Sequence, residues 1–332
     1  MSQSQDSDEG RENNCTNYVL PNYGYILFGD HTCCVKKIVE PCKLLGDGVK
    51  LLQPTNNVSF SFLFALLQYR AKQIPQGYAR HLSILREIEC CIPKKKMQES
   101  IALIIESIDN QISTTKLLLS KYESIKKATV NLLGYAKKGW IRIHVGDLGD
   151  WFKGHGVSMK DTASSGIPCT MYGDIYVKYK EFFTKVDYFL PKDKADAALN
   201  GQYGDLLFTA SGETADEIGK CACYLGDADI CIGGDIIVLR PFHEFDCRFL
   251  AYLLNSPACK SQKATLGQGD AVVHIKQENL QSIELYIPSS LNEQQAISSN
   301  IYSIDKKINS VETNLKKLYN INQSLLQYFF CD

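Results

Sequence analysis

The chain has 332 residues, which is enough for two domains with hydrophobic cores, and its 45% hydrophobic content is ordinary for a globular protein. Its net charge is −1, so the overall charge gives no indication of nucleic-acid binding. The sequence has no signal peptide and no apolar run of about 18 residues, so we expect a cytoplasmic protein that does not enter a membrane.

The first part of the chain combines a polar tail with a short strand-rich region. Residues 1–17 are predicted to be disordered, because they are hydrophilic and acidic. In residues 18–92, apolar runs separated by Gly, Asp and Pro predict strands, and helical spacing predicts a helix over 60–69. The predicted strands are 25–28, 35–39 and 49–52.

Residues 93–138 contain a long amphipathic helix whose pattern returns in residues 291–330. Apolar residues recur at alternating steps of three and four, which is the period of a coiled coil. Each member of this apolar seam has an apolar counterpart 196 positions later: Ile101, Ile105, Ile108, Ile112, Leu119, Tyr122 and Leu133 correspond to Ile297, Ile301, Ile304, Ile308, Leu315, Leu318 and Phe329. Because neither stripe is stable in water, we expect the two helices to pair as an antiparallel coiled coil.

Residues 139–290 are predicted to form a complete strand-rich domain whose second half repeats residues 18–92. Strands are expected at 141–145 and 206–208, on either side of the stretch GIPCTMYGDIYVKYKEF. The repeat is carried at an offset of 187 by Leu239, Pro241, Phe249, Leu250, Leu253 and Leu254, which match Leu52, Pro54, Phe62, Leu63, Leu66 and Leu67. Nothing before Tyr18 matches residues 139–200, so the first domain is expected to be truncated.

The sequence therefore predicts an α+β protein in which strand-rich domains are joined by two long helices. Its charge is segregated between these parts. Residues 93–138 carry nine Lys against four acidic residues, a net of +5, whereas residues 139–290 carry 14 basic and 20 acidic residues, a net of −6. Any DNA binding by the second domain must rest on local contacts.

The thirteen cysteines and six histidines suggest neither a metal site nor a catalytic site by their spacing. The candidate clusters Cys33-Cys34, Cys90-Cys91 and Cys221-x-Cys223 lack the CxxC spacing of a zinc site, so we expect reduced thiols, mostly in cores. The sequence has no Asn-Pro-Pro-Tyr methyltransferase motif, no phosphate-binding loop and no HExxH motif. We therefore expect a non-catalytic protein with no cofactor and no metal.

The order domain, long helix, domain, long helix resembles the specificity subunit of type I restriction–modification enzymes. The resemblance rests on the Ile-Pro pairs before the helices, on Asn-Glu-Gln-Gln at 292–295, and on Ser-Ile-Asp at 107–109 and 303–305. The stretches PCTMYGDIYVKY and GDLLFTASGETADEIGK are also similar to the target-recognition domains of this family.

The resemblance implies a protein that binds double-stranded DNA and does no chemistry of its own. In the family, each recognition domain reads one half of a bipartite site, while the paired helices set the spacing and bind methyltransferase subunits, which restriction subunits then join. DNA reading is expected from residues 139–290, unless a second copy or fragment of the chain completes the first domain. Two other hypotheses are a coiled-coil scaffold that binds no DNA and the targeting subunit of a solitary DNA methyltransferase.

Candidate DNA contacts come from loops of the second domain that offer aromatic, cationic and small hydroxyl side chains. A glycine allows close backbone approach, hydroxyls can contact phosphates or bases, and a glutamine can pair with adenine. The full set is Lys153, Thr170, Tyr172, Gly173, Lys178, Tyr179, Lys180, Thr209, Ser211, Gly212, Gln268, His274 and Lys276. The alternatives are a half-exposed strand with packed tyrosines, a plain turn and an ordinary surface loop.

The two long helices carry paired lysines beside the apolar seam. Lys126, Lys127, Lys316 and Lys317 are candidates for helping to hold the methyltransferase subunits. The alternative is a solvated helix face with no partner.

Overall fold

The computed structural model describes residues 1, 2, 4, 24–46, 48–75, 80–214, 217–269 and 273–330. Most of the tail predicted to be disordered, residues 1–17, lies outside the described residues. The chain forms two compact units, and each contains part of both long helices. Unit 1 comprises Met1–Leu119 and Ser310–Asp332, and unit 2 comprises Ser120–Asn309.

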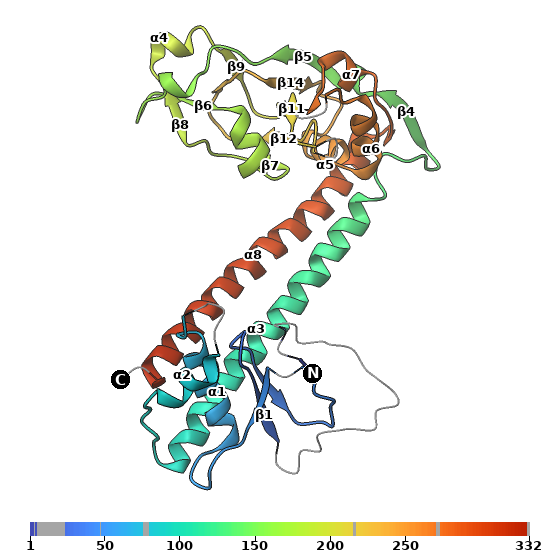
Figure 1. Ribbon diagram of the computed structural model, residues 1–332. Coiled ribbons are helices and arrows are strands. Elements are labelled where there is room, and N and C mark those ends of the chain that lie inside the picture. Colours follow the sequence, from blue (N-terminus) through green and yellow to red (C-terminus); the bar gives the residue numbers. More distant parts are fainter. Residues whose placement is uncertain are drawn as a thin grey trace. The chain divides into compact units, whose positions relative to one another are not determined.

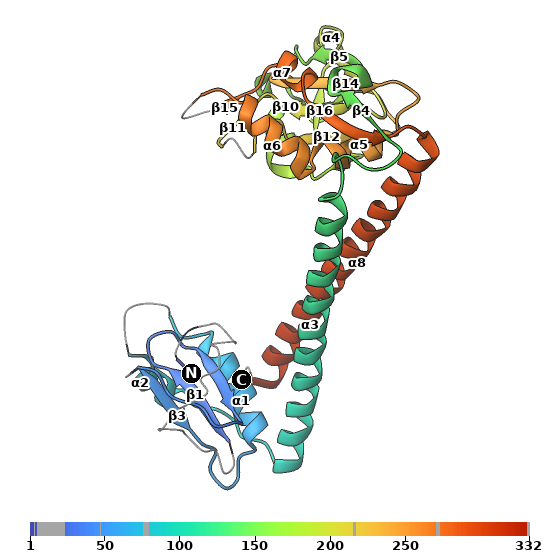
Figure 2. The ribbon, with the colours of Figure 1, turned by 90° about the vertical axis from the view of Figure 1, so that its right-hand side faces the viewer.

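Unit 1 is built on a three-stranded antiparallel sheet. Its elements are β1 (Tyr25–Gly29), β2 (Val35–Ile38), β3 (Val49–Leu52), α1 (Phe60–Ala71), α2 (His81–Glu87), most of α3 (Lys95–Val130) and the end of α8 (Leu291–Phe330). The strand order is β2-β1-β3, with Leu27 opposite both Lys36 and Leu51. Helix α1 contacts β2, and Figure 2 shows it next to the sheet that contains β1 and β3. Three consecutive apolar residues of β1, Ile26, Leu27 and Phe28, are fully buried, so both faces of this small sheet are covered along its central strand.

Unit 2 is larger and contains most of the strands. The strands are β4 (Trp140–His144), β5 (Gly149–Lys153), β6 (Ile167–Thr170), β7 (Phe182–Phe183), β8 (Tyr188–Leu190), β9 (Leu199–Gly201), β10 (Leu206–Thr209), β11 (Ser211–Gly212), β12 (Cys221–Tyr224), β13 (Ile230–Ile232), β14 (Ile236–Pro241), β15 (Val273–His274) and β16 (Glu284–Pro288). The helices and short helical turns are η1 (Val145–Leu148), η2 (Met159–Asp161), η3 (Asp174–Lys178), α4 (Lys192–Ala195), α5 (Cys247–Leu254), α6 (Pro257–Leu266) and α7 (Gln277–Gln281), followed by α8.

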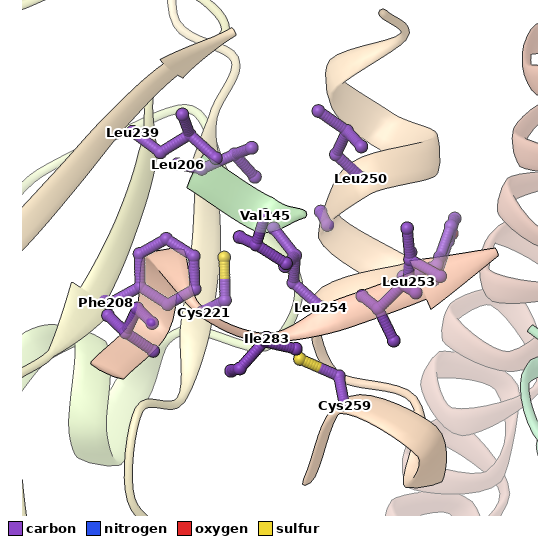
Figure 3. Packing of buried hydrophobic residues seen from close by; sticks show 14 of the residues in the cluster. Val145, Leu206, Phe208, Cys221, Leu239, Leu250, Leu253, Leu254, Cys259 and Ile283 are labelled. Carbon is purple, nitrogen blue, oxygen red and sulfur yellow. The ribbon is translucent and has the colours of Figure 1, made fainter. Parts of the chain in front are cut away.

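The main sheet of unit 2 has five strands in the order β5-β14-β10-β12-β7, and a second sheet has the order β8-β6-β13-β9 (Figure 1). All four residues of β10 are buried, so both faces of its sheet are covered. On one face, Leu206 and Phe208 lie in the same cluster as Leu250 and Leu254 of α5 (Figure 3). Leu207 belongs to a second cluster on the opposite face.

The strands confirm the internal repeat. In unit 2, the central strands have the order β12-β10-β14, with Leu207 opposite both Ala222 and Val238. This order and register repeat those of β2-β1-β3 in unit 1. Unit 2 adds β5 outside β14 and β7 outside β12. Among the described residues of unit 1, no strand pairs with the corresponding outer edges of β3 and β2.

A buried glutamine joins the globular part of unit 1 to its long helix. Gln98 Oε1 accepts a hydrogen bond from Ser59 N at 2.8 Å, and its Nε2 donates to Pro93 O at 2.8 Å and to Asn57 O at 3.0 Å. Ser59 caps α1, because its hydroxyl accepts from Phe62 N. We call this arrangement the glutamine clamp, since one side chain ties the start of α1 to the start of α3.

The glutamine clamp recurs in unit 2. Gln294 Oε1 accepts from Asp246 N at 3.0 Å, and its Nε2 donates to Pro288 O at 3.1 Å. Asp246 caps α5 by accepting a hydrogen bond from Phe249 N. Both glutamines are buried, with 1% of their surface exposed. The duplicated sequence therefore produces the same hydrogen bonds at the start of both long helices.

Several predicted elements differ from the structure. The first long helix was expected over 93–138, but α3 ends at Val130, followed by Gly134 with φ +82°. An added Cβ at Gly134 would meet Ala258 Cβ at 2.9 Å, so a glycine is needed where the chain turns after α3. The second helix, 291–330, and the strand 49–52 match α8 and β3.

The polarity of the described helices and the burial of the described cysteines match what the sequence led us to expect. No helix of the described part of the chain is long and apolar enough to cross a membrane. The described cysteines are free thiols, and most of them are buried. Burial of most of these side chains agrees with the prediction that the cysteines pack mainly in cores.

Candidate nucleic-acid interface

A two-stranded ribbon in unit 2 brings together three of the predicted contact residues. In the pairing of β11 with β15, Ser211 lies opposite His274, and the Ser211 hydroxyl lies 2.9 Å from His274 Nδ1. Gln268 and His274 exchange two backbone hydrogen bonds, at 2.9 and 2.8 Å. The Gln268 and His274 side chains are exposed and Ser211 is half-buried. Two loops that are distant in sequence thus present an amide, an imidazole and a hydroxyl side by side.

Two stacked tyrosines lie against this ribbon. The rings of Tyr172 and Tyr176 are 5.7 Å apart at an interplanar angle of 13°. The Tyr172 hydroxyl donates to Ser211 O at 2.7 Å. The turn that carries them is the π-helical η3, stabilised where Met171 N donates to Asp174 Oδ2. The alternative of a half-exposed strand for this segment is wrong, because β6 ends at Thr170 and a helical turn follows.

A carboxylate, a backbone N–H group and a lysine hold the outer tyrosine in place. The Tyr176 hydroxyl donates to Glu217 Oε2 at 2.6 Å and accepts from Glu213 N at 3.3 Å, while Lys220 Nζ donates to Tyr176 O at 3.0 Å. The hydrogen bond to Glu217 raises the pKa of Tyr176, and burial raises the pKa of Tyr172. Both tyrosines therefore stay neutral at physiological pH, next to negative charge that disfavours phosphate and favours amino groups.

The ribbon, the two tyrosines and the two carboxylates are together called the ribbon site. Its residues are Tyr172, Tyr176, Ser211, Glu213, Glu217, Gln268 and His274. Neither Glu213 nor Glu217 was predicted from the sequence to be a contact residue. The acidic run GETADE directly after the hydroxyl loop was the available signal for the two glutamates.

Several other predicted contact residues are inside the domain. Thr170 and Thr209 have no exposed surface, and Tyr179 is 6% exposed. Tyr179 stacks on Phe183 with 4.1 Å between ring centroids, and burial raises its pKa. Gly212 is buried as well. These residues are therefore not available as direct contacts, because a buried residue cannot touch a ligand without a local rearrangement.

The remaining predicted side chains are exposed lysines. Lys153 lies at the end of β5, and Lys276 precedes α7. Lys178 forms an ion pair with Asp187, so part of its charge is already neutralised. Lys180 is exposed.

Gly173 is also exposed, and an added Cβ would meet no atom within 4 Å. Its backbone lies in the ordinary right-handed helical region. The fold therefore does not require glycine there, and a role in close approach stays a prediction.

The helix lysines fall into two groups. Lys126 does not face solvent as predicted, because its Nζ lies 2.7 Å from Glu181 Oε1 and 2.8 Å from Asp305 Oδ1. Burial by itself lowers the pKa of Lys126, but the two carboxylates raise it above its usual value. Lys127, Lys316 and Lys317 are exposed. Lys126 is therefore part of an internal ion-pair network, and only the other three are accessible to a partner.

A family model and two solved structures that resemble this chain all describe type I restriction–modification specificity proteins. The family model described as the type I restriction modification DNA specificity domain matches residues 2–123 and 169–320. The fold is similar to a type I restriction-modification S subunit from M. genitalium, with a TM-score of 0.61 and 15% identity, over 93% of this chain and 83% of that chain. It is also similar to the HsdS subunit from Thermoanaerobacter tengcongensis, with a TM-score of 0.51 and 15% identity, over 94% of this chain and 81% of that chain. No curated protein matches the sequence.

Proposed function

This chain belongs to the family of type I restriction modification DNA specificity domains, and we propose that its ribbon site reads one half of a bipartite site in double-stranded DNA. The chain then directs methyltransferase subunits, and restriction subunits that join them, to that site and does no chemistry of its own. The observation that carries the proposal is the meeting of Gln268, His274 and Ser211 beside the stacked tyrosines. Residues 139–290 are the reading domain, and residues 93–138 and 291–330 form the spacer.

The chemistry of the ribbon site suits base edges better than phosphates. The Gln268 amide can form a bidentate pair with adenine, and the carboxylates of Glu213 and Glu217 can accept from the amino groups of cytosine or adenine. The same carboxylates repel the DNA backbone. We therefore assign phosphate contacts to the exposed lysines Lys153 and Lys276, and base reading to the ribbon site.

The test is a binding selection on randomised DNA with the chain assembled with its methyltransferase subunits. We expect a recognised sequence in which Ser211→Ala or Gln268→Ala relaxes one contiguous part, at a cost of about 1–3 kcal/mol for a lost bidentate contact. Thr265→Ala is the matched control, because its exposed hydroxyl donates to Ser261 O within α6. An unchanged recognised sequence with both ribbon-site variants would contradict the proposal.

Salt dependence separates the two kinds of contact. Each neutralised phosphate contributes about −0.9 to the slope of log affinity against log salt, so Lys276→Ala should reduce that slope by about one. Ser211→Ala should leave the slope unchanged while altering sequence preference. Because the net charge of residues 139–290 is −6, we also expect a shallow slope for the chain alone. A steep slope would indicate a phosphate-binding surface elsewhere.

For the spacer, we propose an antiparallel pairing of α3 and α8. It is supported within unit 1 by the 3.0 Å hydrogen bond from Asn322 to Asp109 and within unit 2 by the Lys126–Asp305 pair. Cysteine pairs introduced near Ile101 and Phe329 should cross-link within one chain. Cross-links that form only between chains would replace this pairing with a dimer.

The exposed helix lysines Lys127, Lys316 and Lys317 are proposed to help hold the methyltransferase subunits. Reversing the three charges together should weaken co-purification with these subunits, and unchanged association would remove this face from the proposal.

A further inference from the structure

The two-stranded ribbon of unit 2 is short and needs support from the residues beneath it. Its first arm comprises the described residues of 211–219, and its second arm comprises those of 267–275. The strands β11 and β15 have two residues each, and an isolated two-stranded ribbon is at best marginally stable in water. The position of one arm relative to the other must therefore be fixed by contacts with the rest of unit 2.

Lys263 of α6 is bonded to one end of each arm. It is buried, with 1% of its surface exposed. Its Nζ donates hydrogen bonds to Gly219 O at 2.5 Å and to Leu254 O at 2.7 Å. Its backbone oxygen accepts a hydrogen bond from Gly267 N at 2.9 Å. The side chain of Lys263 thus holds the end of the first arm, and its main chain holds the start of the second.

The charge of Lys263 is not explained by packing alone. Both of these acceptors are backbone carbonyl oxygens rather than carboxylates, and the centroid of the Phe208 ring lies 5.3 Å from Nζ. Leu254 is the last residue of α5, so its carbonyl lies at the negative end of the helix dipole. Burying an ammonium group is costly even so, and an apolar side chain of similar volume would avoid that cost. Such a side chain has no donor, however, and could not hold the Gly219 carbonyl to α6.

The position of Gly219 also affects the stacked tyrosines. Gly219 has φ +64°, and an added Cβ there would meet Lys263 Cδ at 3.1 Å, so the first arm and the lysine are in close contact. The next residue, Lys220, donates from its Nζ to Tyr176 O at 3.0 Å. Lys263 therefore influences three parts of the ribbon site, namely both arms and the turn that carries the tyrosines.

We propose that Lys263 is a positioning residue of the ribbon site, which fixes the first arm relative to the second and so sets the distance between their base-reading side chains. Ser211 and Glu217 belong to the first arm, and Gln268 and His274 belong to the second. Base contacts tolerate little displacement, because a hydrogen bond weakens steeply with distance and angle. The effect of Lys263 on specificity rests on the base reading proposed for the ribbon site, but its effect on the order of the two arms does not.

Hydrogen exchange of the full chain tests the order of the two arms without DNA. Lys263→Met keeps most of the length of the side chain but removes its donor. We expect amides of both arms, including those of Gln268 and His274, to exchange at least about tenfold faster, while those of β10 and β14 stay protected. Lys260→Met, at an exposed position of the same helix, is the control and should change neither arm. Unchanged exchange in both arms, or equal acceleration in β10 and β14, would overturn the proposal.

A second variant disturbs the same contact from the other side. Gly219→Ala keeps Lys263 but presses an added Cβ against its Cδ and strains a backbone with positive φ. Gly204→Ala is the matched control, because Gly204 has φ +90° and an added Cβ there would meet only Cys247, at 3.8 Å. Gly219→Ala should accelerate exchange in both arms and Gly204→Ala should not. Should Lys263→Met fail to fold, this pair of variants decides the question.

A binding selection on randomised DNA, with the chain assembled with its methyltransferase subunits, tests the effect on specificity. Lys263→Met and Gly219→Ala should each reduce base preference by about tenfold in the part of the recognised sequence that Ser211→Ala also changes. Affinity for nonspecific DNA and its salt dependence should not change, because phosphate contacts come from other residues. Lower stability alone would reduce the fraction of competent protein and so weaken specific and nonspecific binding equally.

The same selection distinguishes the positioning role from base reading itself. If Ser211→Ala changes the recognised sequence but Lys263→Met and Gly219→Ala do not, Lys263 has no positioning role and base reading by the ribbon site stands. If none of the three variants changes it, both proposals are wrong.

Discussion

Units 1 and 2 share three strands, a capped helix and a glutamine clamp, yet they differ in what surrounds these parts. In unit 2, β5 and β7 flank the shared strands, and the first four residues of β14 are buried. In unit 1, all four residues of β3 are only half-buried. Tyr172 and Tyr176 come from the part of unit 2 that has no repeat in residues 18–92. The repeated half therefore builds the scaffold, and the unrepeated half supplies much of the ribbon site.

The same aspartate has different surroundings in the two units. Asp305 pairs with Lys126 and accepts a hydrogen bond from the Tyr252 hydroxyl at 2.5 Å. Its counterpart Asp109 accepts a hydrogen bond from the neutral Asn322 and has a raised pKa because it is partly buried. An identical residue in a repeated helix thus meets a cation in one unit and a neutral amide in the other.

The largest expected loss of stability comes from truncating the equivalent core residues Phe208 and Phe28, which are both fully buried. Phe208→Ala should destabilise unit 2 by about 3–5 kcal/mol, because its large cluster cannot collapse around the cavity. Phe28→Ala should cost less, because its cluster has only a few buried members and relaxes more easily.

Both tryptophans, Trp140 and Trp151, lie in unit 2, so tryptophan fluorescence during denaturant unfolding reports on unit 2 alone. Phe208→Ala should lower that transition, whereas Phe28→Ala should change only the transition seen by circular dichroism. An equal shift of tryptophan fluorescence in both variants would mean that the two units unfold together.

The next largest loss of stability should come from removing the glutamine clamp, and it should be nearly equal in the two units. Gln294→Ala leaves Asp246 N without its acceptor, and Gln98→Ala does the same to Ser59 N. Each should cost about 1–3 kcal/mol, because a buried donor is left unsatisfied. The exposed Gln295→Ala is the control. Denaturant unfolding of all three variants checks this, and a much smaller cost in one unit would show that its clamp is not equivalent.

The smallest change in stability should come from replacing the repeated aspartate by asparagine. Its sign should differ between the two units. Asp305→Asn should destabilise unit 2 by about 1–2 kcal/mol, because Lys126 loses one charged partner while the amide can still accept hydrogen bonds. Asp109→Asn should stabilise unit 1 at neutral pH by less than about 1 kcal/mol, after allowance for solvent screening. The raised pKa of Asp109 means that its neutral form is favoured in the folded state.

The pH dependence of Asp109→Asn provides the check. A carboxyl with a raised pKa favours folding below its unfolded pKa, and this contribution is lost as pH rises through its folded pKa. The gain from Asp109→Asn should therefore be present at neutral pH and disappear in acid, as measured by circular dichroism during thermal unfolding. Destabilisation of unit 1 at neutral pH would show that ionised Asp109 is instead stabilised there.

The sequence predicted the parts of the fold that depend on short-range pattern. The apolar seam specified α8 over its whole length, and the strand 49–52 follows from a short apolar run between Gly and Pro. The π-helical turn η3 was not predicted, because the aromatic and β-branched residues of DIYVK favour a strand. An Asp174 carboxylate bonded to the backbone of Met171 overrides that preference locally.

The ribbon site was predicted in part. Loop composition selected Ser211, Gln268 and His274, but their contact depends on a strand pairing between distant segments that spacing does not reveal. Hydroxyl residues next to these loops also suggested Thr170 and Thr209, whose buried positions depend on the neighbouring strands. Lys126 likewise lies on a helix face that Glu181, from a distant loop, covers.

The glutamine clamp has a consequence for how such chains can change over evolution. Its hydrogen bonds in unit 2 join Gln294 only to Asp246 and Pro288, and those in unit 1 join Gln98 only to residues of unit 1. A recombination event that exchanges the segment from capped helix to helix start as one piece would carry its own joint with it. We therefore expect that a globular part exchanged together with the start of its own long helix would keep these hydrogen bonds intact.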